Sequence, residues 1–374
     1  MNRIVVYDTW LNGLRFVDFL PIKYMNNQWI FLHTSSLFGH GNDESKWSGE
    51  TRDLKEWGYN ITKSLQALRP DKVLVISIHN YEQRILINVC NRLGIAVDFY
   101  PHGIRVKEKI VARGNRSYRD YLNRFVLHLF RLTKLLNANS DIYSLSLRLG
   151  ILSTILSNYN GFKNGQIQLL PIQIRRTALN SSGQKEYFIN DWNLLGTEYF
   201  VTNNVKNLFD AKACEPSATP RDYVLFIGQP LYGGAKNYTR YFEEFASVIK
   251  NKVGGRLIFR PHPSQQASFD SLPSDIFEVS TESINTLMGK VKLVVGVNSA
   301  MLYLAELLHI PRCIFSGVDK IDFPDLLSTD LVLHDTKRIE ARVDEWCDDL
   351  LNTWSYESNN IDKYWSNWQS FIGD

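Results

Sequence analysis

Short apolar runs alternate with amphipathic stretches along the first hundred residues. The apolar runs have the length of buried strands, and the stretches between them carry apolar side chains at helical spacing. The expected strands cover 4–7, 29–36, 72–78 and 95–100, and the expected helices cover 12–20, 54–68 and 80–94. Strands that alternate with helices predict a parallel sheet with helices on both faces.

A second alternating block begins near residue 222. Its expected strands cover 223–230, 256–263, 275–280, 292–299, 312–317 and 331–335, with helices over 239–252, 283–290 and 300–310. The two blocks predict an α/β protein with two Rossmann-like, doubly wound domains that face a central cleft. We expect the N-terminal domain at 1–180, the C-terminal domain at 181–345, and helices over 346–374 that pack back on the N-terminal domain.

Residues 104–160 interrupt the first block with long helices. Between Arg105 and Lys134 the sequence has nine Lys or Arg against two acidic residues, Glu108 and Asp120. A basic, amphipathic helix favours an anionic membrane surface. A solvated helix face is the alternative interpretation of the same pattern.

The overall composition is that of an ordinary globular protein. The net charge of +3 over 374 residues is too small to indicate nucleic-acid binding. No apolar run reaches the length of a membrane span, and none of the four cysteines is part of a C-x-x-C pair. Buried thiols indicate a reducing compartment, so we expect a cytoplasmic protein, with peripheral contact to the inner membrane through the basic helices near 104–134.

Several signatures of nucleotide and metal chemistry do not occur in the sequence. There is no G-x-x-x-x-G-K-[ST] and no G-x-G-x-x-G after a strand, which argues against P-loop enzymes and dinucleotide oxidoreductases. There is also no D-x-D, no H-E-x-x-H and no Cys or His cluster at metal spacing. We therefore expect a reaction without a metal ion or a cofactor.

Small and polar residues follow four strands of the second block. Open α/β sheets bind ligands at the carboxyl ends of their strands, and a strand followed at once by a helix N-terminus suits a phosphate. An acid further along that helix can accept from ribose hydroxyls. The resulting donor-binding candidates are Gly228, Gln229, Arg260, Pro263, Ser280, Thr281, Asn298, Ser299 and Glu306. Plain helix caps and a surface carboxylate are the alternative interpretation.

The stretches LFIGQPL, RPHP and VNSAMLYLAELLHIP, within residues 222–317, resemble the donor domain of GT-B glycosyltransferases. They are most similar to bacterial sialyltransferases and polysialyltransferases, which use CMP-sugars to build lipooligosaccharide and capsule. The resemblance implies that His262 and Pro263 contact the donor phosphate together with the pair Asn298 and Ser299. It also implies metal-independent, inverting transfer of a sugar, sialic acid above all, to a hydroxyl of a glycan or glycolipid.

The expected base of the reaction departs from that family. The family keeps an acidic residue before a glycine in the first domain, whereas this chain reads DFYPHGI, with His102 before Gly103. The pair resembles the base of the teichoic-acid CDP-glycerol phosphotransferases, which share the fold. A histidine whose pKa lies near neutrality suits general-base catalysis. The catalytic candidates are therefore His102 and His262.

Other strand ends of the first block would line the acceptor side. These acceptor-binding candidates are Asp8, Trp10, His33, His79 and Asn80. Alternative functions keep the site and change the chemistry. They are transfer of Kdo from CMP-Kdo, phosphotransfer from CDP-glycerol, a UDP-N-acetylglucosamine 2-epimerase relative, and a non-catalytic nucleotide-sugar-binding protein.

Overall fold

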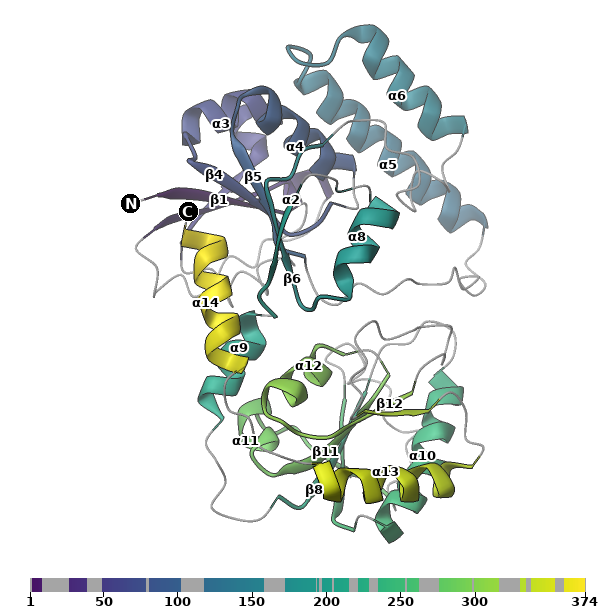
Figure 1. Cartoon of the computed structure of the whole chain (residues 1–374). Helices are drawn as coiled ribbons and strands as arrows, with labels where there is room; N and C mark the ends of the chain where they lie inside the picture. The colour runs from purple at the N-terminus through teal and green to yellow at the C-terminus, as the bar shows by residue number, and fades with distance from the viewer. Residues whose placement is uncertain are drawn as a thin grey trace.

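The computed structural model describes seventeen segments, and its helices and strands form two α/β domains (Figure 1). The segments are residues 2–8, 27–38, 49–78, 81–101, 118–157, 172–192, 194, 197–203, 205–214, 221–228, 235–252, 254–261, 276–297, 299–315, 330–333, 338–353 and 360–373. The α/β class and the two parallel sheets expected from the alternating pattern are confirmed.

The first sheet has seven parallel strands in the order β3-β2-β1-β4-β5-β6-β7. Their bounds are β1 Arg3–Asp8, β2 Gln28–His33, β3 Glu50–Asp53, β4 Lys72–Val75, β5 Ala96–Phe99, β6 Arg176–Leu179 and β7 Glu198–Val201. The helical elements of this part of the chain are α2 Ser35–Phe38, η4 Leu54–Trp57, α3 Ile61–Leu68, α4 Tyr81–Arg92, α5 Tyr118–Ala138, α6 Leu145–Ser157 and α8 Gln184–Trp192. The strand order reverses at β1, so its carboxyl end lies at a topological switch point, where open α/β sheets bind ligands.

The second sheet has six parallel strands in the order β10-β9-β8-β11-β12-β13 and reverses in the same way at β8. Its strands are β8 Tyr223–Ile227, β9 Arg256–Arg260, β10 Glu278–Val279, β11 Val291–Gly296, β12 Arg312–Phe315 and β13 Leu331–Leu333. The helices that follow the first sheet are α9 Val205–Ala213, α10 Ala235–Lys252, α11 Ile284–Met288, α12 Ala300–Leu307, α13 Ile339–Thr353 and α14 Asn360–Gly373. Both domains are therefore doubly wound.

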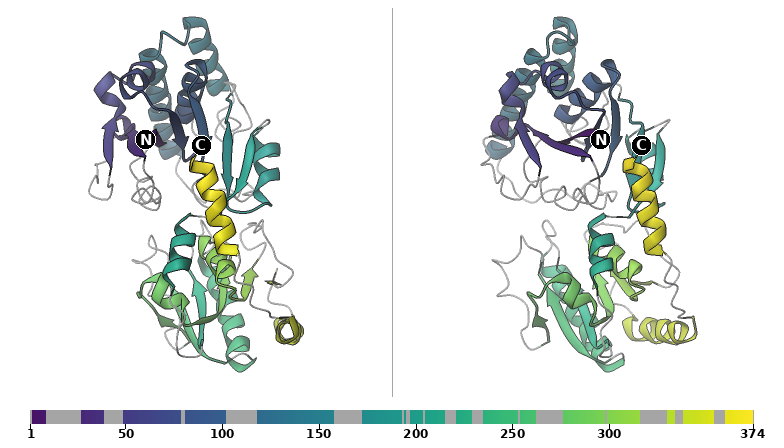
Figure 2. Two further views of the ribbon diagram at one scale, coloured as in Figure 1. Left: turned by 60° about the vertical axis from the view of Figure 1, so that its left-hand side comes forward. Right: turned by 90° about the vertical axis from the view of Figure 1, so that its left-hand side faces the viewer.

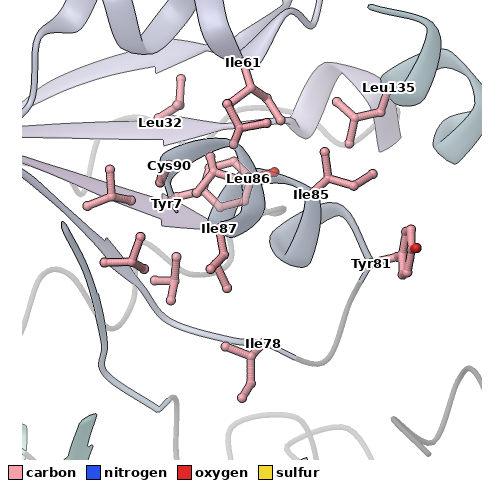
Figure 3. Packing of buried hydrophobic residues seen from close by; sticks show 14 of the residues in the cluster. Tyr7, Leu32, Ile61, Ile78, Tyr81, Ile85, Leu86, Ile87, Cys90 and Leu135 are labelled. Atoms are coloured by element: carbon pink, nitrogen blue, oxygen red, sulfur yellow. The ribbon is translucent and has the colours of Figure 1, made fainter. Parts of the chain in front are cut away.

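Continuous apolar runs form the central strands because both faces of each sheet are covered. In the first domain one buried cluster joins Tyr7 of β1, Leu32 of β2, Ile61 of α3, Leu86 of α4 and Leu135 of α5 (Figure 3). Burial of this apolar surface stabilises the sheet at about 25 cal/mol per Å² removed from water. The cluster also fixes α5 to the domain.

Helix α14 lies at the junction of the two domains (Figure 2). It contacts β6, β7 and α9, while α9 contacts α11 and α12 of the second domain. The Trp368 ring is fully buried, and its centroid lies 5.3 Å from that of Tyr100. Lys72 Nζ donates to the carbonyl of Ile372 at 2.6 Å. Helix α14 is thus anchored in the first domain and reaches the second through α9.

Two expected domain boundaries need correction. Strand β7 pairs with β6 in the first sheet, so that domain extends to Val201 and not to 180. Helix α13 contacts α10 and β13, and its Ile339 and Val343 are buried in the core of the second domain. Of the segment 346–374, the part that packs back is therefore α14, because the apolar face of α13 is already covered by its own domain.

Candidate functional site

Four of the expected donor-binding residues lie at the carboxyl edge of the second sheet. Ser280, Arg260 and Gly228 come at the ends of β10, β9 and β8, and Ser299 follows β11. These strands are direct neighbours in the order β10-β9-β8-β11. Neighbouring strands are about 4.8 Å apart, so the four positions span about 14 Å. The structure therefore brings them into one row long enough for a nucleotide.

Arg260 is the cation of this row. It is half-buried at the end of β9, and Nη1 donates to the carbonyl of Glu282 beyond β10. Burial lowers the pKa of Arg260, while the carboxylate of Asp210 on α9 opposes that shift. An arginine still carries its charge at neutral pH after such a shift, because its ordinary pKa is so high. The row thus contains a fixed positive charge in partly desolvated surroundings.

The serine hydroxyls of the row act within their own turns. Ser299 is the N-cap of α12 and accepts from Met301 N at 3.3 Å. Ser280 Oγ accepts from Glu282 N at 3.2 Å, and Thr281 is exposed beside it. The helix-cap interpretation therefore describes Ser299, whereas Ser280 closes a turn before α11, whose N-cap is Ser283. A cap leaves the direction of the helix dipole unchanged, so the first turn of α12 still favours an anion.

Glu306 is separated from this row. It lies at the C-terminal end of α12, where Oε2 is 3.0 Å from Nη1 of Arg312. Arg312 begins β12, which places the pair at the amino edge of the sheet. Seven residues of α-helix span about 10 Å, which is the length that separates Ser299 from Glu306. The structure does not bring Glu306 to the edge where a ribose would bind.

Two of the expected acceptor-side residues are neighbours at the carboxyl edge of the first sheet. Asp8 of β1 is the register partner of His33 of β2, and His33 is the register partner of Asp53 of β3. His33 is buried, its Nδ1 accepts from Ser35 N at 3.3 Å, and the same atom lies 3.6 Å from Asp53 Oδ2. Gln83 Nε2 donates to Asp8 Oδ1 at 3.2 Å. A polar row therefore follows β1, β2 and β3.

Eight expected site residues lie outside the described residues. They are Trp10, His79, Asn80, His102, Gln229, His262, Pro263 and Asn298. The prolines directly before the two candidate catalytic histidines are described: Pro101 is buried after β5 and Pro261 is half-buried after β9. The roles of His102 and His262 stay predictions from the sequence.

Glu82, in the first turn of α4, is a charged residue of this region that the sequence did not predict as part of the site. Its side chain is 1% exposed, and Oε1 lies 3.7 Å from Nδ1 of His128 on α5. Burial lowers the pKa of nearby Arg131, and the carboxylate of Glu82 opposes that shift. An acid in the first turn of a helix that follows a strand end is favoured by the helix dipole. The position of Glu82 after a strand, at the start of a helix, could therefore have predicted a charged group beside the polar row of the first sheet.

No protein-family model matches the sequence, and no curated protein matches it either. Solved structures match the fold. A protein assigned as a UDP-N-acetylglucosamine 2-epimerase from Listeria monocytogenes is 10% identical, with a TM-score of 0.51 over 97% of this chain and 90% of that one. The spinosyn rhamnosyltransferase SpnG is 10% identical, with a TM-score of 0.45 over 100% of this chain and 96% of that one. The wall teichoic acid polymerase TagF is 8% identical, with a TM-score of 0.47 over 100% and 89%.

Proposed function

We propose that this chain, whose two parallel-sheet α/β domains have the GT-B fold, is a metal-independent, inverting glycosyltransferase. It would move sialic acid from a CMP-sugar to a hydroxyl of a cell-surface glycan, such as lipooligosaccharide or capsule. The observation that carries the proposal is the row Ser280, Arg260, Gly228 and Ser299 on four adjacent strand ends. Such a row suits a nucleotide donor with a phosphate.

The donor would lie along this row with its phosphate near Arg260 and the first turn of α12. Gly228 is buried, and its N–H donates to the carbonyl of Arg260 at 2.8 Å, which fixes β8 and β9 side by side where they end. The cytosine ring of the donor would lie near Gly228, where the absence of a side chain lets a ring approach the backbone. The helix dipole and the Arg260 guanidinium favour the phosphate without a metal ion.

The reaction would be a single displacement. The acceptor oxygen attacks the anomeric carbon while His102 takes the proton from that oxygen. The bond between the anomeric carbon and the phosphate oxygen breaks, and CMP leaves with the electron pair. Arg260 and His262 stabilise the negative charge that grows on the phosphate, as preorganised donors do in other transferases. Attack from the face opposite CMP inverts the anomeric centre.

Replacement of His262 tests the proposal. Loss of one preorganised donor lowers the rate on the order of 10²–10³-fold, and we expect this for His262→Ala in a transfer assay with CMP-sialic acid. His309→Asn is the matched control, because His309 follows α12 near the opposite edge of the sheet and its positive φ of 49° suits asparagine. Full activity of His262→Ala would remove His262 from the reaction.

One set of assays with different donors distinguishes CMP-sialic acid from the alternative donors. CMP-Kdo, CDP-glycerol and UDP-sugars are offered beside CMP-sialic acid, and release of the free nucleotide is measured with each. Turnover of CDP-glycerol would make the protein a phosphotransferase and support the resemblance of His102 to the base of that class. Binding of a donor without turnover on any acceptor would favour a nucleotide-sugar-binding protein.

A UDP-N-acetylglucosamine 2-epimerase activity is the second candidate, because a protein assigned that activity is the structure that matches at a TM-score of 0.51. Epimerisation needs no acceptor, whereas transfer does. Conversion of UDP-N-acetylglucosamine in the absence of any glycan would therefore select the epimerase.

The place of the reaction is part of the proposal. We propose a cytoplasmic enzyme that works at the inner membrane, where a glycolipid acceptor would be found. The basic sequence between Arg105 and Lys134 supports this location.

A further inference from the structure

Helices α5 and α6 expose large apolar side chains. Within the described residues, eight large hydrophobic side chains are exposed, and six of them belong to these two helices. They are Val126, Leu127, Phe130, Leu145, Leu149 and Leu156, with exposed fractions from 49% to 64%. Single exposed apolar residues are common, but a concentration of this kind on one helical pair marks a contact surface.

The exposed residues form stripes. An α-helix turns by about 100° per residue, so Leu145, Leu149 and Leu156 lie within about 40° of one another on α6. Val126 and Phe130 are likewise within about 40° on α5. We call these five residues the apolar stripes. Two exposed apolar side chains on α5 and three on α6 therefore lie on one side of their helix.

The stripes are separate from the faces that hold the helices in place. Leu132 and Leu136 of α5 and Ile151 and Ile155 of α6 are buried in the core of the first domain. On each helix these positions are at least about 80° away from the apolar stripe. Each helix therefore has one apolar face for the core and a second apolar face that the core does not use.

The helical pair lies at the far end of the first domain. Helices α5 and α6 contact each other, and in both Figure 1 and Figure 2 they lie away from α14 and from the second domain. A large flat partner could reach the stripes without touching the second sheet.

The charge of the pair is positive. Helices α5 and α6 contain five Lys or Arg and one acidic residue, Asp120. The cations are Arg119, Arg124, Arg131, Lys134 and Arg148. Lys134 is exposed, and its Nζ lies 4.4 Å from the centroid of the Tyr59 ring. Apolar residues accompanied by basic ones are typical of helices that lie in the surface of an anionic bilayer.

We propose that α5 and α6 dock the protein on an anionic lipid bilayer through the apolar stripes. The stripes would enter the boundary between headgroups and acyl chains, and the basic residues would meet the lipid phosphates. No helix within the described segments is long and apolar enough to cross a bilayer, and a surface contact requires none. Only the purpose of this docking rests on the proposed function: it would bring the active site to a glycolipid acceptor.

A second copy of the chain is the less favourable occupant. A symmetric contact places the same patch on both sides of the interface. The net positive charge of one helical pair would then lie against the same charge of the other. Like charges in such a contact oppose association, whereas an anionic bilayer attracts the same charges.

The test is flotation of the full-length protein with lipid vesicles, without donor or acceptor. Phosphatidylcholine vesicles are compared with vesicles that also contain phosphatidylglycerol, at low and at high salt. The test variant is Phe130→Ser with Leu149→Ser, and the control is Val279→Ser, whose side chain is 49% exposed on β10 of the second domain. We expect binding to the anionic vesicles, weaker binding at high salt, and about a tenfold loss for each serine in the stripes.

The outcomes are distinct. Equal binding by the double variant and the wild type overturns the proposal. So does a wild-type dimer, seen by sedimentation, that the double variant dissolves while neither protein binds vesicles. Circular dichroism shows whether the double variant is folded, and transfer to a soluble acceptor shows whether it keeps activity. Vesicle binding by a protein that turns over no donor would leave the docking surface intact and contradict the proposed function instead.

Discussion

Glu306 lies 3.0 Å from Arg312, a residue that is 1% exposed at the start of β12. Arg312 also donates to Asp330 from Nε at 2.7 Å and from Nη2 at 2.5 Å. Burial alone would lower the pKa of Arg312, but its bonds to Asp330 and the charge of Glu306 raise it. The guanidinium therefore stays charged and is balanced by the two carboxylates. The three side chains lie at the amino edge of the second sheet, opposite the row that begins with Ser280 and ends with Ser299.

This arrangement predicts that Glu306 acts on stability and not on donor binding. Glu306→Gln removes one charge from the partly exposed side of the pair, and we expect the free energy of unfolding to fall by about 1 kcal/mol. Asp330→Asn leaves a buried arginine without its bidentate partner and should cost about 3 kcal/mol. Urea unfolding measures both values. Weaker donor binding by Glu306→Gln at unchanged stability would restore the ribose-binding role.

The position of Glu306 explains what the sequence could and could not predict about the site. Spacing along the chain identified a helix after Ser299, and that helix exists as α12. The helix runs back from the carboxyl edge to the amino edge, so a residue seven places on lies near the start of the next strand. The nearby partner, Arg312, is separated from Glu306 by a turn that contains Pro311. Only the packing of α12 on the sheet shows that the two side chains meet.

The strands were predictable where burial on both faces produces an apolar run. IVVY of β1, KVLV of β4 and YVLFI of β8 are of this kind. Strand β3 has the sequence ETRD, lies at the edge of the first sheet and has no buried residue. It is a strand because it pairs with β2, and its own composition does not predict one. Strand β7 (EYFV) lies at the opposite edge and also has no buried residue. Strand β6 (RTAL) is buried, but its four residues form no apolar run. Both were missed, and with them the end of the first domain.

Arg260 gives the sharpest test within the donor row. Arg260→Gln keeps a donor to the Glu282 carbonyl but removes the charge that a phosphate would meet. We expect kcat/KM for the CMP-sugar to fall about 10²-fold, as for loss of one charged donor to a phosphate in the transition state. Steady-state kinetics with varied donor measures the change.

Arg256 is the matched control, because it begins the strand that Arg260 ends. Its side chain is 52% exposed and pairs with Glu278 on β10. Arg256→Gln should leave kcat/KM unchanged. Equal losses for the two variants would mean that strand β9, and not the charge at its carboxyl end, is what the substitution disturbs.

The thiol of Cys214 should react slowly. Burial raises its pKa to about 11, and the carboxylate of Asp210 adds to the shift. Sγ also donates to the carbonyl of Asn285 at 3.4 Å. A thiol reacts as its thiolate, so alkylation by iodoacetamide at neutral pH should be about 300-fold slower than for a free cysteine, whose pKa is about 8.5. The rate should rise about tenfold per pH unit from pH 7 to 10.

Mass spectrometry of peptides labelled over this pH range measures the rate at each cysteine. A plateau of the Cys214 rate near pH 9 would show that the thiol is less buried than the structure describes. The same experiment on Asp210→Asn should raise the rate, because the variant lacks the carboxylate that disfavours the thiolate.

Trp368 should be the residue of α14 on which the fold depends most. Its ring is fully buried, with centroids 5.3 Å from Tyr100 and 5.7 Å from Phe371. Replacement of a buried tryptophan by alanine costs about 3–5 kcal/mol, because the cavity adds to the lost burial. We expect Trp368→Ala to lose that much in urea unfolding and to release α14 from the first domain, which hydrogen exchange of α14 would report.

Trp365 is the matched control in the same helix. It is half-buried, its ring centroid lies 5.2 Å from that of Phe209 on α9, and Lys212 Nζ lies 4.3 Å from the same centroid. A half-buried ring leaves a smaller cavity, so Trp365→Ala should cost about 1–2 kcal/mol. Because α9 contacts α12 of the second domain, this variant should loosen the connection between the domains while α14 stays on the first sheet. Equal loss of exchange protection along α14 in both variants would contradict the separate roles of the two tryptophans.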